Sequence, residues 1–104
     1  MEVSKNDWKL FRACIGEWQD AYMEHLIKEY MDLLSGEENA SDKFWKLEER
    51  IKKDKKHPGV MLELSKGSMI FDIVALINSG AITTADLEGF SDELKEVVDF
   101  LLHR

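Results

Sequence analysis

The sequence predicts an all-α fold, a small bundle of four main helices with a short helix before the last one. Three observations predict this class. Apolar residues recur at spacings of three and four, the period of an amphipathic helix. No stretch alternates apolar and polar residues for long enough to be a strand. The chain holds only 6 glycines and 1 proline in 104 residues, which argues against disorder, and its length indicates one helical domain over 1–104.

The first predicted helix runs from about Asn6 to Leu34. Asn6 or Asp7 is expected to cap its start, and Ser35-Gly36 to end it, with Gly36 able to take the left-handed conformation. About 28 residues is long for a helix in so small a domain, so part of it is expected to project or to pack against a second copy. Its apolar stripe is unusually aromatic and consists of Trp8, Phe11, Ile15, Trp18, Tyr22, Leu26, Tyr30 and Leu33.

A second helix is expected from a Ser41 cap to about Lys55. Its buried face is predicted to carry Phe44, Leu47 and Ile51. Trp45 points about 100° away from Phe44. The helix ends before the His57-Pro58-Gly59 sequence, which breaks the chain.

The third segment, Val60 to Asn78, is apolar on nearly all sides, which is typical of a central, buried helix. The Ser65-Lys66-Gly67-Ser68 sequence either kinks this helix or splits it, with Ser68 capping the second piece. The segment is expected to stop at Asn78-Ser79-Gly80.

Two capped helices are expected to complete the chain. Thr83 or Thr84 caps a short turn through Glu88, and Ser91 caps the last helix. The inner face of that last helix is predicted to be Leu94, Val97, Val98, Leu101 and Leu102.

Charge is distributed unevenly. The chain carries 14 Lys and Arg against 21 Asp and Glu, a net charge of −7. Residues 37–42 hold three acidic and no basic side chains, whereas residues 43–57 hold seven basic and three acidic ones. The basic end could contact a phosphate, a nucleic acid or an acidic partner; the alternative is a solvated face that suits the helix dipole. The candidate anion contacts are Arg50, Lys52, Lys53, Lys55 and Lys56.

Nucleic acid is not an expected partner, because the acidic remainder would repel its backbone and no aromatic residue alternates with the lysines. A compact acidic protein can instead imitate nucleic acid and block a basic groove. An inhibitor of a basic nuclease or defence protein, antitoxin-like in its action, is therefore the first alternative function. The alternative to mimicry is that the charge serves solubility.

The aromatic residues are the candidate interface. Trp, Tyr and Met are enriched where proteins meet. Met23, Ile27 and Met31 widen the apolar arc of the first helix beyond what one facing helix covers. A homodimer through this helix or a groove for a partner helix is expected, the alternative being that the aromatic residues pack internally. The interface candidates are Trp8, Trp18, Tyr22, Tyr30 and Trp45.

No residue is expected to be catalytic, and no metal or cofactor is expected. His25, His57 and His103 form no metal-binding pair along the chain, and the single cysteine, Cys14, is predicted to be a small core residue. The second alternative function is a small enzyme that uses a buried carboxylate, with Glu29 or Asp72 as the acid.

The chain is expected to act in the cytoplasm and not in a membrane. Its first residues are polar and acidic, unlike a secretory signal. The longest apolar run, Met69 to Ile77, contains Asp72 and is about half the roughly 20 residues that a membrane span requires.

Several stretches resemble a known family. They are Ser41-Asp42-Lys43-Phe44-Trp45, Arg50-Ile51-Lys52-Lys53-Asp54-Lys55-Lys56, Ser68-Met69-Ile70, Leu76 to Thr83 and Asp86 to Lys95. They resemble a family of small uncharacterised bacterial proteins that carry the automatic label "multidrug transporter". The resemblance covers most of the chain and implies a small bacterial cytoplasmic helical domain. It rests on no catalytic motif, so it assigns no site residues.

These observations favour a non-enzymatic interaction or regulatory module of a bacterial or mobile-element cytoplasm. Its partner would be another protein or a second copy of the chain, contacted through helices.

Overall fold

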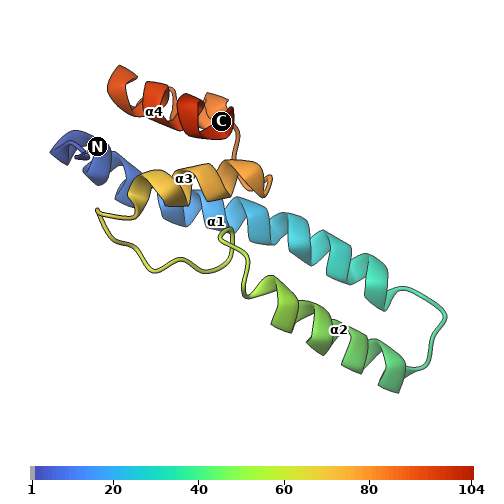
Figure 1. Cartoon of the computed structure of the whole chain (residues 1–104). Helices are drawn as coiled ribbons and strands as arrows, with labels where there is room; N and C mark the ends of the chain where they lie inside the picture. The colour runs from blue at the N-terminus through green and yellow to red at the C-terminus, as the bar shows by residue number, and fades with distance from the viewer. Residues whose placement is uncertain (1) are drawn as a thin grey trace.

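The computed structural model describes residues 2–104 and is all-helical over that range, with no strand (Figure 1). The predicted fold class is confirmed: four main helices are present, with a short 3-10 helix before the last. The elements are α1 (Lys5–Leu34), α2 (Ala40–Asp54), α3 (Met69–Asn78), the 3-10 helix η1 (Thr84–Leu87) and α4 (Asp92–Leu102).

Helix α1 takes part in two separate packing arrangements. Its first half packs with α3, η1 and α4, which we call the core lobe. Its second half pairs with α2 in an antiparallel helical hairpin, formed by residues 23–54, that projects from this lobe (Figure 1). The molecule accordingly measures 53 × 23 × 20 Å with a radius of gyration of 16.6 Å, against about 13 Å for a compact chain of this length.

The core lobe contains nearly all of the buried apolar side chains. Phe11 and Ile15 of α1 meet one face of α3, and α4 covers another part of the same helix. Burial of each such side chain is worth roughly 1.5–3 kcal/mol, so this lobe supplies most of the stability. The remaining buried members are Val3, Met69, Ile70, Ile73, Leu76, Ile82, Leu87, Phe90, Leu94 and Val98.

One buried carboxylate joins the starts of α1 and α4. Asp7 is only 3% exposed. Its Oδ1 accepts a hydrogen bond from the Ser91 backbone N–H (2.9 Å), and its Oδ2 accepts one from the Ser91 hydroxyl (2.5 Å). Ser91 also caps α4 as predicted, its Oγ accepting from the Leu94 N–H (3.2 Å). The expected cap of α1 by Asn6 or Asp7 is wrong: Ser4 caps the helix, and the Asp7 side chain is thereby free to hold α4.

Two other local expectations are wrong. Helix α2 is capped by Asn39, not Ser41, because the Asn39 side chain accepts from the Asp42 N–H (2.8 Å) and starts the helix earlier. Gly36 is not left-handed, since α1 ends at Ser35, whose N–H and hydroxyl both bond the Asp32 carbonyl. Of the residues described, only Gly80 has a positive φ, 84°.

The expected third helix exists only in its second half. Residues 60–68 form an irregular strap, and helix α3 begins at Met69. The strap runs from the base of the hairpin to the start of α3 (Figure 1). A turn over residues 66–68, in which the Ser68 N–H donates to Ser65 Oγ (3.1 Å), ends the strap, so the helix begins only after it. Ser68 precedes α3 but makes no side-chain cap.

The expected buried face of α2 is also wrong. Phe44 is 62% exposed and Ile51 is 36% exposed, and α2 has no fully buried residue. Among the helices of residues 2–104, α1 is the one that packs along this helix, so one side of α2 has no helical neighbour within that range (Figure 1). For η1 and α4, the structure agrees better with the expectations from the sequence. Thr83 forms a capping box with Asp86, and the predicted inner face of α4 is buried or half-buried.

None of the helices formed by residues 2–104 has the length and hydropathy needed to cross a membrane.

Replacing the buried carboxylate, Asp7→Ala, should lower the free energy of unfolding by about 2–3 kcal/mol, because it removes two hydrogen bonds and leaves a polar backbone group unpaired. Urea unfolding followed by circular dichroism measures this change. The control is Asp99→Ala, whose side chain is 71% exposed and whose loss should cost well under about 1 kcal/mol. Equal unfolding midpoints for the two variants would show that Asp7 is not a structural link.

Candidate functional site

Two of the candidate interface residues belong to the core lobe. Trp8 and Trp18 are half-buried and flank Phe11, with ring centroids 6.1 Å from it on either side. Trp18 also lies 6.1 Å from Phe90, and the Arg12 guanidinium sits 5.3 Å above the Trp8 ring. These contacts are internal, so the first half of the aromatic stripe packs within the chain.

Tyr22 holds the turn that follows α2. Its ring stacks on His57 at 4.2 Å with an interplanar angle of 10°. The His57 Nδ1 accepts a hydrogen bond from the Gly59 N–H (2.8 Å), and the Gln19 side chain donates to the Pro58 carbonyl (3.1 Å). The turn is therefore fixed to the middle of α1 by one stacked ring and one hydrogen bond.

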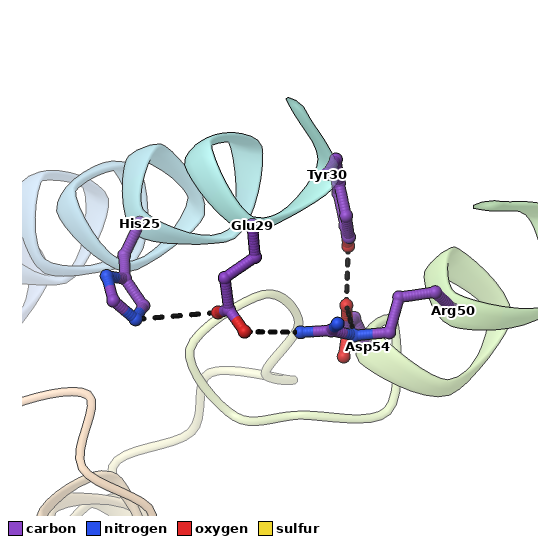
Figure 2. Close-up of polar contacts among 5 residues, drawn as sticks. All are labelled: His25, Glu29, Tyr30, Arg50 and Asp54. Carbon is purple, nitrogen blue, oxygen red and sulfur yellow. Dashed lines mark hydrogen bonds and ion pairs between the residues drawn. The ribbon is translucent and has the colours of Figure 1, made fainter. Parts of the chain in front are cut away.

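A polar network joins the two helices of the hairpin (Figure 2). The Tyr30 hydroxyl of α1 donates to Asp54 Oδ2 of α2 (2.6 Å). Arg50 donates from Nε to the same oxygen (3.1 Å) and from Nη2 to Glu29 Oε1 (2.9 Å). His25 Nε2 lies 3.4 Å from the other Glu29 oxygen. The network places α2 at one register along α1.

This network also decides what its members can do chemically. Burial, followed by the hydrogen bond to Asp54, raises the pKa of Tyr30 to about 12. The hydrogen bond to Glu29 raises the pKa of Arg50 further above its ordinary value. Glu29 is paired with that guanidinium and is 41% exposed. A carboxylate in such a place lacks the desolvation that makes a general acid.

The other candidate acid, Asp72, lies on α3 away from this network. It is half-buried, and desolvation raises its pKa, while the hydrogen bond from the Ser68 hydroxyl (2.9 Å) opposes the rise. Burial and the nearby Glu17 carboxylate raise the pKa of the Cys14 thiol, the opposite of what activates a nucleophile. Within residues 2–104, no three His, Cys, Asp or Glu side chains are arranged to hold a metal ion.

The structure divides the candidate anion contacts between two sides of α2. Arg50 is engaged with Glu29 and Asp54. Lys52 and Lys55 border a hollow on one side of the helix, whereas Lys53 borders another hollow beside Leu33. Lys56 follows the end of α2 and is exposed. The residues do not converge on one point, which is what binding a single small anion would require.

The hairpin instead presents an apolar surface, which we call the hairpin face: Ile27, Met31 and Leu34 of α1 with Phe44, Leu47 and Ile51 of α2. Ile27 and Ile51 line one cavity of about 180 Å³ between the helices. Ile51, Leu47 and Phe44 line an adjoining hollow of about 480 Å³ along α2. Ile27 is 54% exposed and Met31 64%. The surface is therefore continuous from one helix to the other.

Trp45 extends this surface around α2. It is 62% exposed, and its ring meets the Phe44 ring edge-on at 5.0 Å. Of the five candidate interface residues, Trp45 alone is exposed. The arc of Met23, Ile27 and Met31 pointed to the α1 part of the hairpin face, whereas the α2 part was expected to be buried. The spacing of Phe44, Leu47 and Ile51 marks an apolar stripe on α2. Spacing alone does not say whether another part of the molecule covers that stripe.

A scan against models of protein families, a search of curated proteins and a search of solved structures each found no match for this chain.

Gly59→Ala should destabilise the chain by about 1–3 kcal/mol, because the added Cβ would lie 2.5 Å from the Tyr22 ring and force the stack apart. Gly16→Ala is the control. Nothing lies within 4 Å of its added Cβ, and replacing a glycine inside a helix should stabilise by roughly 0.5–1 kcal/mol. Thermal unfolding distinguishes the two, and the same sign for both would contradict the close approach of Tyr22 to Gly59.

The Tyr30 contact predicts a dependence on alkaline pH. A pKa raised from 10 to about 12 means that the fold favours the neutral phenol. This contribution to stability is fully present below pH 10 and is lost as the pH rises through about 12. Titration of the phenolate absorbance should show a step near pH 12 that is absent from Tyr30→Phe. If the variant keeps that step, the assignment to Tyr30 fails.

Proposed function

We propose that this chain is a non-enzymatic protein-interaction module and that its binding surface is the hairpin face. The observation that carries the proposal is the exposure of Ile27, Met31 and Phe44 together on a hairpin that projects from the core lobe. Scattered exposed apolar residues are ordinary, but a contiguous patch is typical of an interaction site.

The energetics of α2 support this proposal. The helix has no fully buried residue, so it gains little from its own chain by apolar burial. Covering the hairpin face would add roughly 25 cal/mol for each Å² of apolar surface removed from water. A partner on this face would therefore supply stabilisation that the hairpin does not obtain within one copy.

The rigidity of the hairpin also supports it. The Tyr30–Asp54 and Arg50–Glu29 hydrogen bonds hold the two helices together, and the Tyr22–His57 stack holds the turn after α2. Because these contacts fix the positions of the two helices before binding, a partner need not order the backbone that carries the face. Such preorganisation reduces the entropic cost of association.

The test is capture of binding proteins from a bacterial lysate by the tagged full chain, at low and high salt, with mass spectrometry. The face variant is Phe44→Glu combined with Ile27→Glu. The control is Phe71→Glu combined with Phe100→Glu, which places the same two charges on exposed apolar residues of α3 (62%) and α4 (69%).

We expect the wild type and the control to retain the same protein at both salt concentrations, because apolar contacts are not screened, and the face variant to lose it. Retained copies of the chain itself count as such a protein. Capture of a basic protein that is lost at high salt and is indifferent to the face variant would overturn the proposal. That result would favour the acidic inhibitor that imitates nucleic acid.

A further inference from the structure

We infer that a second copy of this chain occupies the hairpin face, with the two hairpins antiparallel about a two-fold axis. The inference rests on the proposed function and names its partner. It is argued from charge complementarity, symmetry and area.

Charge changes sign along the loop and α2. The tip of the hairpin carries Glu37, Glu38 and Asp42, and the end of α2 near the core lobe carries Lys52, Lys53, Lys55 and Lys56. Lys46 pairs with Glu38 near the tip, which neutralises only part of that acidic cluster. Along the loop and α2, the hairpin is therefore acidic at its tip and basic at its base.

The same reversal borders the apolar surface itself. Glu48, Lys52 and Lys55 line the hollow that holds Phe44 and Ile51. Glu48 lies nearer the tip, and the two lysines lie nearer the base. Within residues 2–104 neither Glu48 nor these lysines forms an ion pair. The charges beside the face are available to a partner.

A surface that is acidic at one end and basic at the other is complementary to its own reverse. A partner of uniform charge would be repelled by one end of the face. Two hairpins stacked face to face can be related by a two-fold axis that runs either along the helices or across them. The first arrangement places the two acidic tips together, where like charges repel.

The second arrangement places the tip of each hairpin at the base of the other. Helix α2 then packs antiparallel on α2 of the second copy, and Glu48 of each copy lies opposite Lys52 of the other. The two copies of Ile51 meet between these charged pairs, and Phe44 of each copy lies at the base of the other. The spacing that marks Phe44, Leu47 and Ile51 as an inner face is then satisfied in the assembly, as in a four-helix bundle.

The available area fits a dimer that dissociates on dilution. Helix α2 has 15 residues and is about 22 Å long, and two packed helices are about 20 Å wide. The face therefore covers roughly 450 Å² on each copy, or about 900 Å² in total, which is the size of a weak, transient interface. Self-association should depend on concentration across the micromolar range.

The experiment is sedimentation velocity of the full chain over a wide concentration range. We expect the wild type to shift from monomer to dimer as its concentration rises. Phe44→Lys should abolish the shift, because it removes an apolar side chain and places a positive charge at the basic base of the other copy, and the matched control Phe100→Lys should retain it. Because Phe44 and Phe100 are more than half exposed, both variants should keep the wild-type circular dichroism spectrum.

Charge reversal tests the antiparallel geometry. Glu48→Lys alone or Lys52→Glu alone should raise the dimer dissociation constant about tenfold, because each places like charges at both symmetry-related contacts. An equimolar mixture of the two variants should recover the wild-type dissociation constant as a heterodimer. In that heterodimer each introduced charge faces its opposite.

The outcomes separate this inference from the proposed function. A wild type that stays monomeric at every concentration overturns the second copy as occupant. If the lysate experiment retains a different protein through the face, the proposed function survives that result. If nothing is retained, the proposed function fails as well. A dimer that persists in Phe44→Lys, or a mixture of charge variants that does not recover association, overturns the antiparallel interface.

Discussion

The length of α1 is the constraint on which the rest of the structure depends. Its 30 residues extend for about 45 Å, whereas α3 and α4 have 10 and 11 residues and extend for about 15 Å each. The two short helices can cover only the first half of α1. The second half therefore leaves the core lobe, and α2 is the one helix beside it (Figure 1). A long helix with short partners produces a projecting hairpin.

Polar contacts set the position of α2, because its apolar side chains do not. In the core lobe, Phe11 and Ile15 are held by apolar burial from several elements. Helix α2 has no fully buried residue, and its register follows from the Tyr30–Asp54 and Arg50–Glu29 contacts across the hairpin (Figure 2). Tyr30 and Asp54 line the same cavity as Ile27 and Ile51. The polar contact that positions α2 therefore lies directly beside the hairpin face.

The sequence predicted features that depend on neighbours along the chain. The bounds of α1 and α4 and the Ser91 cap follow from local spacing and local hydrogen bonds. The link between Asp7 and Ser91 spans 84 positions, and no local pattern indicates which acidic residue makes it. The apolar pattern of residues 60–64 indicated a helix there, but these residues form an irregular strap that a turn over 66–68 separates from α3.

By itself, the sequence determined the helical class, the apolar stripes and the reversal of charge between residues 37–42 and 43–57. Each of these properties is a matter of residue type and spacing. Only the tertiary structure decided which stripes are covered. Trp8 and Trp18 pack against the core lobe, which includes elements that come late in the chain. No such late element covers Phe44 and Ile51, and both stay exposed. The physical reason is that spacing fixes the direction in which a side chain points, while burial requires a second surface at that place.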